Sequence, residues 1–224
     1  AHPKVRKLAF TGSTEVGRGV ARAAAERVIP VTLELGGKSA NIVFPDAPME
    51  RAVEAAAMGI LYGQGQVCSA GSRLLLHQEI HDEFISKLKG RFESIPIGDP
   101  LSEASRMGPL ISRQQYESVC DYIDEGKKAG ARLVTGGERL SGPKYEKGYF
   151  IAPTLFADCT PEMRIVQEEI FGPVLVVQRF SSETHAIELA NESSYGLAGA
   201  VWTADLNRAF RVTAEVDTGT MWIN

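Results

Sequence analysis

Residues 73–92, RLLLHQEIHDEFISKLKGRF, determine the class of the fold. The run from Arg73 to His77 is mostly apolar and has the length of a strand. After a short turn, apolar residues recur at every fourth position, at Ile80, Phe84, Leu88 and Phe92. That spacing places them on one face of a helix. The stretch therefore predicts a β-strand followed by an amphipathic α-helix.

The same alternation of strand and helix continues toward the C-terminus. The pattern predicts helices over about 113–128, 182–191 and 205–215, and strands over about 132–134, 149–156, 174–180, 199–203 and 219–223. Strands that alternate with helices build βαβ units. We therefore expect an α/β fold with a mostly parallel or mixed sheet and flanking helices.

The residues before position 70 extend this pattern. A short apolar run at 8–10, a glycine turn at 12–17 and a helical repeat that stops at Pro30 predict a strand, a turn and a helix. Residues 31–35 and 39–44 are two further strand candidates. Asp46 is the expected N-cap of the next helix, and Pro48 is expected in its first turn, where its missing N–H is harmless.

The character of the sequence changes at the glycine pair 36–37. Residues 1–36 are typical of the C-terminal part of a dinucleotide-binding, Rossmann-type unit, and residues 37–224 are long enough for a domain with its own core. The chain begins Ala-His-Pro-Lys and stops inside the apolar run 221–224. Both ends therefore indicate a piece of a longer protein, with the second domain truncated at its C-terminus.

The composition argues against several classes of partner. Twenty-four basic and 28 acidic residues give a net charge of −4, which lacks the basic field that nucleic-acid binding needs. No polybasic run marks a membrane surface, and no apolar stretch is long enough for a transmembrane helix. With 44% hydrophobic residues the chain is not intrinsically disordered. We expect neither a nucleic acid nor a membrane as partner.

The cysteines and histidines predict neither a disulfide framework nor a metal site. Three cysteines, Cys68, Cys120 and Cys159, are too few and odd in number. We therefore expect a reducing, cytoplasmic compartment, where an important cysteine is a reactive thiol. Only His77 and His81 share helical spacing, and no cluster of cysteines or carboxylates joins them. We therefore expect no metal site.

Cys68 is the first candidate for chemistry. It lies in GQVCSAGSR, residues 65–73, where small neighbours would let a substrate approach the sulfur. It follows a glycine loop and precedes a strand, and such loops commonly present nucleophiles. A thiol must still ionise before it attacks. A buried structural cysteine is the alternative interpretation.

Glu34 is the second candidate. It lies in LELGGKS, residues 33–39, at the end of a strand with apolar neighbours on both sides. A carboxylate held in apolar surroundings binds a proton more tightly than in water, which suits a general base. Because strand residues alternate in direction, Glu34 could equally face water.

Two loops complete the set of candidates. The turn GSTEVG at residues 12–17 opens a helix, where backbone N–H groups accept a phosphate. It is neither GxGxxG nor a P-loop, since Arg18 and Gly19 replace the required Lys-Ser/Thr, and it also fits an ordinary tight turn. The run EEIFGP at 168–173 suits a rigid ligand-contacting loop, or a solvated loop in which Phe171 plugs the core.

Together, four segments in this order resemble the aldehyde dehydrogenase superfamily. They are FTGST (10–14), LELGGKS (33–39), GQVCSAGSR (65–73) and EIFGPV (169–174), and the resemblance continues through YGL (195–197) to GTMWIN (219–224). Cys68 follows Glu34 by 34 residues, a spacing that also fits the family. The resemblance covers essentially the whole chain.

The resemblance implies NAD(P)-dependent oxidation of a small-molecule aldehyde to a carboxylic acid, with NAD favoured over NADP. Cys68 would be the nucleophile, whose thiolate forms a thiohemiacetal with the oxyanion held partly by the Cys68 backbone N–H. Hydride transfer to the nicotinamide would leave a thioester. Glu34 would be the general base that activates water to hydrolyse it, unlike the relatives that pass the acyl group to coenzyme A.

The resemblance also implies which residues contact the cofactor. The cofactor would be oriented by the protein and would itself carry the hydride. The residues implied are Gly12 and Ser13 at the pyrophosphate, Gly17 where the backbone approaches closely, Leu35 beside the nicotinamide amide, Glu169 on the ribose hydroxyls and Phe171 packed beside ribose and nicotinamide.

Several departures from the family limit what the chain is expected to do. The large N-terminal part of the family is absent, and with it most of the adenosine pocket and an asparagine of the oxyanion hole. Gly63 stands where many members have Asn. We therefore expect the isolated segment to be inactive or nearly so, and the parent protein to be a homo-oligomer. Residues 38–44 and 65–73 are similar to betaine-aldehyde and related bacterial members.

Two other functions compete with this interpretation. One is a non-catalytic structural or binding protein that retained the fold and lost the chemistry. The other is a cysteine hydrolase in which Cys68 works with a histidine, which spatial rather than sequence proximity would have to supply.

Overall fold

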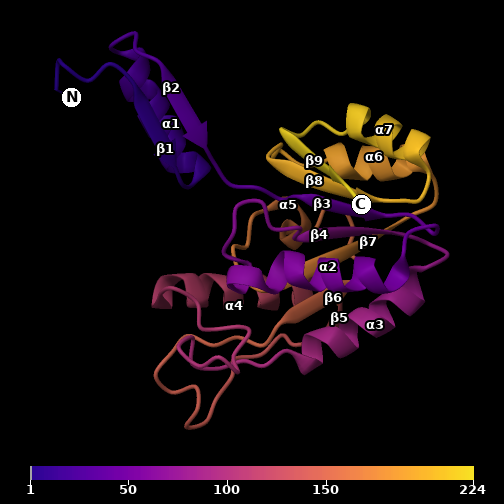
Figure 1. Cartoon of the computed structure of the whole chain (residues 1–224). Coiled ribbons are helices and arrows are strands. Elements are labelled where there is room, and N and C mark those ends of the chain that lie inside the picture. Colours follow the sequence, from indigo (N-terminus) through magenta and orange to yellow (C-terminus); the bar gives the residue numbers. More distant parts are fainter. Residues whose placement is uncertain (1) are drawn as a thin grey trace.

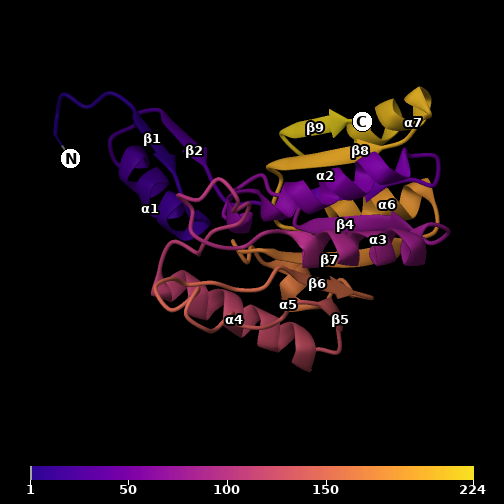
Figure 2. The ribbon, with the colours of Figure 1, turned by 60° about the horizontal axis from the view of Figure 1, so that its bottom comes forward.

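The structure is a computed structural model that describes residues 2–224 (Figure 1). Its strands form one two-stranded and one seven-stranded sheet among these residues. The small sheet pairs β1 (Leu8–Thr11) and β2 (Val31–Glu34) in parallel, and α1 (Thr14–Ala25) connects them. This N-terminal unit, residues 8–34, projects from one end of the larger sheet (Figures 1 and 2).

The larger sheet is mixed, as expected, and has the strand order β5-β6-β7-β4-β3-β8-β9. Its neighbouring strands are parallel except for the antiparallel pair of β5 and β6. The strands are β3 (Ala40–Val43), β4 (Arg73–His77), β5 (Arg132–Thr135), β6 (Thr154–Ala157), β7 (Val174–Phe180), β8 (Ala198–Trp202) and β9 (Thr220–Ile223).

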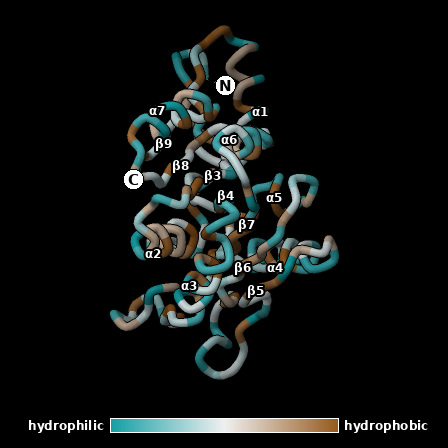
Figure 3. Tube along the Cα trace, turned by 90° about the vertical axis from the view of Figure 1, so that its right-hand side faces the viewer, coloured by the Kyte–Doolittle hydropathy of each residue, from teal (hydrophilic) through white to brown (hydrophobic). Residues whose placement is uncertain are grey.

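Helices cover both faces of this sheet (Figure 3). One face packs against α2 (Met49–Leu61) and α3 (His81–Ser94), and a 3₁₀ turn at Tyr62–Gly65 follows α2. The other face packs against α4 (Arg113–Lys128), α5 (Arg164–Gln167), α6 (Glu183–Asn191) and α7 (Leu206–Glu215). Leu74 and Leu76 of β4 contribute to the first core, and Leu75 to the second, because strand residues alternate in direction. The architecture is a three-layer α/β domain.

The strand predicted over 149–156 is wrong in its first half. Only β6 forms regular pairs, while Tyr149 and Ile151 make isolated bridges to Leu110 and Arg139. Pro153, which has no N–H to donate to a ladder, separates the two parts. The one-turn helix α5 was not predicted, since four residues are too few to show a helical period.

Asp46 is not the N-cap of α2. Pro48 occupies that position and makes no side-chain cap hydrogen bond. The Asp46 carboxylate instead accepts hydrogen bonds from the Thr203 hydroxyl and the backbone N–H of Ala204 and Asp205, and it pairs with Arg208 at 2.9 Å. Asp46 therefore ties the loop after β3 to the start of α7.

Within residues 2–224, every helix is too short or too polar to cross a lipid bilayer.

Candidate active site

A cavity of about 630 Å³ lies between the N-terminal unit and the larger sheet. Its walls come from four segments just before or after strands, and from one helix. They are residues 11–13, 35–36, 66–68 and 169–171, together with Gln115, Ser118 and Tyr122 of α4. Three of the segments precede β3, β4 and β7, so the cavity lies at the amino ends of these parallel strands.

The pair Gly36–Gly37 brings three of these segments together. The backbone N–H of Gly37 donates a hydrogen bond to Glu169 Oε1 at 3.1 Å. A side chain at position 36 would collide with the Glu169 carboxylate, and one at position 37 would collide with the backbone oxygen of Cys68. The absence of side chains in this pair therefore lets the 169–171 segment and the Cys68 loop share one cavity.

Cys68 lies in the cavity wall and is half-buried. All three cysteines are free thiols, but Cys120 and Cys159 are buried. Burial raises the pKa of the Cys159 thiol to about 12, and burial also raises the pKa of Cys120. Cys68 is therefore the one cysteine of the three that a molecule in the cavity can reach.

Glu169 places a carboxylate in the same cavity. Burial raises the pKa of Glu169, and the Gly37 N–H and the nearby Lys38 ammonium oppose that rise. Phe171 follows two residues later, lines the cavity and is 37% exposed. Its φ of 55° lies in the left-handed region, which is rare for an aromatic residue.

Gly12 and Ser13 line the cavity at the N-terminus of α1. Ser13 is the N-cap and accepts a hydrogen bond from the Val16 N–H at 3.3 Å. Free N–H groups and the helix dipole make this end attractive to anions. Gly17 is not part of the wall: it is buried against the Leu35 side chain, which a side chain at position 17 would displace.

Glu34 follows the second of its two interpretations, in which the side chain faces water. Its side chain is exposed to solvent and is not part of the cavity wall, although the next residue, Leu35, is. Its backbone oxygen accepts a hydrogen bond from the Gly12 N–H at 3.0 Å. The structure therefore brings together Gly12, Ser13, Leu35, Cys68, Glu169 and Phe171 in one wall, and leaves Glu34 and Gly17 beside it.

Sequence reasoning missed the contribution of α4. Gln115, Ser118 and Tyr122 reach the cavity from the helix that was predicted over about 113–128 without any functional role. Their spacing of three and four residues places them on one helix face, which is the only sequence signal they carry. No histidine lines this cavity within residues 2–224, and that range holds no group of three residues suited to a metal.

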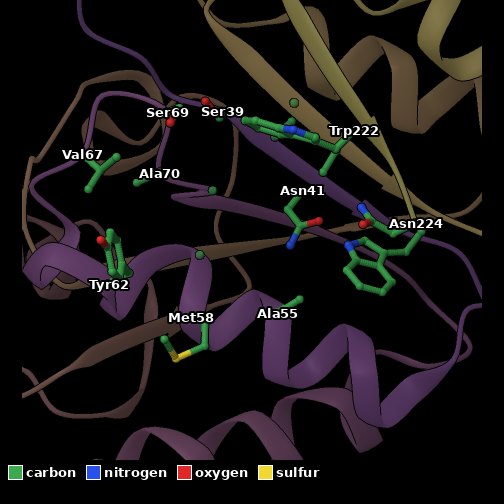
Figure 4. Close-up of a pocket in the computed structure, with 16 residues that line it drawn as sticks. Ser39, Asn41, Ala55, Met58, Tyr62, Val67, Ser69, Ala70, Trp222 and Asn224 are labelled. Carbon is green, nitrogen blue, oxygen red and sulfur yellow. The ribbon is translucent and has the colours of Figure 1, made fainter. Parts of the chain in front are cut away.

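A second chamber of about 500 Å³ lies beside the loop that carries Cys68 (Figure 4). Val67 lines both cavities, and Ser69 and Ala70 line only the second of the two. Met58 and Tyr62 lie on one side of the chamber in Figure 4, and Trp222 and Asn224 on the other. Among the described residues, no acidic or basic side chain lines it.

The fold and these cavities define an α/β protein in which a half-buried cysteine lines a cavity between a small parallel βαβ unit and a seven-stranded sheet. The chain matches the aldehyde dehydrogenase family over residues 1–224 and belongs to that family. The resemblance inferred from the sequence is thereby confirmed.

Solved structures agree with this assignment. Betaine aldehyde dehydrogenase from Staphylococcus aureus in complex with NAD+ is 43% identical, with a TM-score of 0.97 over 100% of this chain and 44% of that one. A point mutant of the same enzyme, with NAD+ and a cysteine modified by β-mercaptoethanol, is 43% identical and has a TM-score of 0.96. That match covers 99% of this chain and 45% of the mutant enzyme. A candidate aldehyde dehydrogenase from Burkholderia cenocepacia is 44% identical and has a TM-score of 0.97. That match covers 99% of this chain and 45% of the Burkholderia protein. The chain spans less than half the length of these proteins.

Proposed function

We propose that the protein to which this chain belongs oxidises an aldehyde to a carboxylic acid with NAD(P)+, and that Cys68 is the nucleophile. The observation that carries the proposal is the shared cavity, which places the Cys68 thiol, the Glu169 carboxylate and the N-terminus of α1 in one wall. The NAD+ complexes of the similar structures support it and favour NAD over NADP.

The residues present fit a dinucleotide. Gly12 and Ser13 at the helix N-terminus would hold the pyrophosphate, and the Glu169 carboxylate would accept hydrogen bonds from ribose hydroxyls. The Phe171 ring and the Leu35 backbone would flank the nicotinamide. Bound there, NAD(P)+ supplies the hydride acceptor for the oxidation.

The chain's own residues would carry out the covalent steps. The Cys68 thiolate forms a C–S bond with the aldehyde carbon, and the carbonyl electron pair moves to oxygen, where the Cys68 N–H donates a hydrogen bond. After oxidation the acyl group is held as a thioester on Cys68. Glu34 then accepts a proton from a water whose oxygen attacks the thioester carbon, and the C–S bond breaks to release the acid and the thiolate. Because the Glu34 side chain is exposed, it must turn toward the cavity to do so.

The second chamber would hold the body of the aldehyde. It adjoins the Cys68 loop through Val67, Ser69 and Ala70, and Val67 lines both cavities, so an aldehyde held there would lie next to the loop that carries the sulfur. A lining without acidic or basic side chains fits an aldehyde that carries no anionic group. The similarity to betaine aldehyde dehydrogenases points in the same direction.

The 224-residue chain alone is expected to turn over an aldehyde and NAD+ slowly or not at all. It spans 45% of the similar aldehyde dehydrogenases, and its N-terminal unit is a two-stranded part of a dinucleotide-binding domain that we place at 1–36. The catalytic domain would be 37–224, and the whole protein would be a cytoplasmic homo-oligomer. A turnover rate comparable with that of an intact enzyme would disprove the inactivity of the chain alone.

Acyl transfer tests the roles of Cys68 and Glu34 without the cofactor. With 4-nitrophenyl acetate we expect one rapid equivalent of nitrophenol per chain, followed by slow turnover. Cys68→Ala should abolish the burst, and Glu34→Gln should keep the burst while the later phase falls by roughly 10²-fold or more, since general-base catalysis contributes about that much. Cys159→Ala, which changes a buried thiol, is the matched control and should keep both phases. A burst that survives in Cys68→Ala would remove the basis of the proposal.

A further inference from the structure

The turn at residues 169–172 has an unusual backbone where it enters the cavity. It connects α5 to β7 and carries both Glu169 and Phe171. Phe171 adopts a φ of 55°, a conformation that costs a residue with a Cβ more than it costs glycine. Something in the surrounding structure must therefore compensate for this conformation.

The compensation comes from a single side chain on α4. Gln115 Nε2 donates hydrogen bonds to two successive backbone oxygens, those of Ile170 at 2.9 Å and Phe171 at 2.8 Å. Both distances are those of well-formed hydrogen bonds. One amide group thus fixes two neighbouring carbonyls of the turn in the direction that the left-handed residue requires.

Gln115 is itself held in place by the start of its helix. Its backbone N–H donates to the hydroxyl of Ser112, the N-cap of α4, at 3.2 Å. The opposite side of the turn is closed by Gly65, where any side chain would collide with the backbone oxygen of Gly172. The turn is therefore held between α4 and the loop that carries Cys68.

We propose that Gln115 is a positioning residue for the cofactor side of the cavity. It acts through the turn, and sets where the Phe171 ring and the Glu169 carboxylate lie relative to Gly36 and Cys68. This inference rests on the proposed function for its consequence in cofactor binding. The hydrogen-bonded clamp itself can be tested independently of that function.

The first experiment is a double-mutant cycle in the 224-residue chain, measured as the urea midpoint of unfolding. Gln115→Met keeps the length of the side chain and removes the donor, and Phe171→Gly relieves the left-handed strain. Gln115→Met should lower the midpoint, and by clearly less in the Phe171→Gly background. Ser182→Ala, which removes the N-cap hydrogen bond of α6 and has no contact with Gln115 or the turn, should lower the midpoint equally in both backgrounds. Additive effects of Gln115→Met and Phe171→Gly would overturn the proposal.

The second experiment asks whether the clamp acts on the cofactor cavity. NADH affinity should fall about tenfold in Gln115→Met, while the rate of Cys68 alkylation by iodoacetamide stays within about twofold, since the Cys68 loop is not altered. Ser182→Ala, the N-cap variant of α6, should change neither. Equal loss of NADH affinity in both variants would reduce Gln115 to a structural role and overturn the proposal. If the 224-residue chain binds no NADH, as its two-stranded part of the dinucleotide-binding domain would allow, the mutant cycle alone decides the clamp.

Discussion

Lys38 is buried beside the candidate site at an energetic cost. The residue is 2% exposed, and its Nζ has no hydrogen-bond partner within residues 2–224. Burial, helped by the positive charge of Arg73, lowers the pKa of Lys38 to about 7 from its ordinary 10.5. Between pH 7 and 10.5 the unfolded chain therefore binds a proton that the folded chain does not, so this residue makes stability rise with pH across that window.

Lys38→Met should remove this pH dependence. The variant should be more stable than the wild type at pH 7, and its advantage should shrink as the pH approaches 10, because the wild-type penalty disappears there. Urea unfolding at pH 7, 8.5 and 9.5 measures the difference. Lys87→Met, which removes a partly exposed lysine paired with Glu50, should give a nearly constant difference. A Lys38→Met advantage that does not change with pH would contradict the lowered pKa.

The residues of the site differ in how far the sequence could reveal them. Cys68 and Glu169 lie within short motifs, so the neighbouring residues in the sequence are enough to identify them as candidates. Gln115 does not, because its role depends on a carbonyl 55 residues away. The exposure of Glu34 was one of two alternatives that the sequence left undecided, since flanking leucines indicate a strand but not which side of it faces solvent.

Arg73 connects β4 with the segment before β3 and with the end of the helix α6. Its guanidinium donates to the backbone oxygens of Lys38 before β3 at 2.9 Å, and of Leu189 and Ala190 at the end of α6, both at 2.7 Å. A cation at this end of α6 also interacts favourably with the helix dipole. Burial lowers the pKa of Arg73 to about 10, which still leaves it charged at neutral pH.

Arg73→Leu should destabilise the fold by about 3–5 kcal/mol, since it leaves three buried carbonyls without their donor. Arg73→Lys should recover little of this loss, because an ammonium group cannot match the planar fork. Arg211→Leu is the control: it breaks an exposed pair with Glu183 and should cost less than about 1 kcal/mol. Denaturant unfolding compares the three variants, and similar losses for Arg73→Leu and Arg211→Leu would refute this account.

Helices and strands were predicted correctly where a hydrophobic repeat extends over many residues. The prediction failed where tertiary contacts determine the role of a residue. The four-residue repeat in 80–92 gave α3 within one residue of its start at His81. By contrast, Asp46 has the right chemistry for an N-cap, but its carboxylate binds the Thr203–Asp205 segment, more than 150 residues away. Contacts over that separation leave no local pattern in the sequence.

At the scale of the molecule, the cavity lies at the amino ends of β3, β4 and β7. Open α/β sheets usually bind ligands at the carboxyl ends of their strands. Here the carboxyl ends that take part belong to β1 and β2 of the N-terminal unit, through residues 11–13 and 35–36. The site is thus assembled between two sheets. The motifs that contain Cys68 and Glu169 can be recognised in the sequence. Their contact in one cavity becomes visible only in the structure, where both pack against Gly36–Gly37.

The N-terminal unit should be dispensable for folding and necessary for the cavity. None of the three hydrophobic core clusters contains a residue from 8–34. A chain of residues 36–224 should therefore unfold cooperatively, with a Tm within a few degrees of the full chain. Its Cys68 should react with iodoacetamide several times faster, because the wall formed by residues 11–13 and 35 is gone. The same deletion combined with Cys68→Ala should show no fast labelling. An unfolded product, or an unchanged labelling rate, would mean that the two parts form one cooperative body rather than two units meeting at a site.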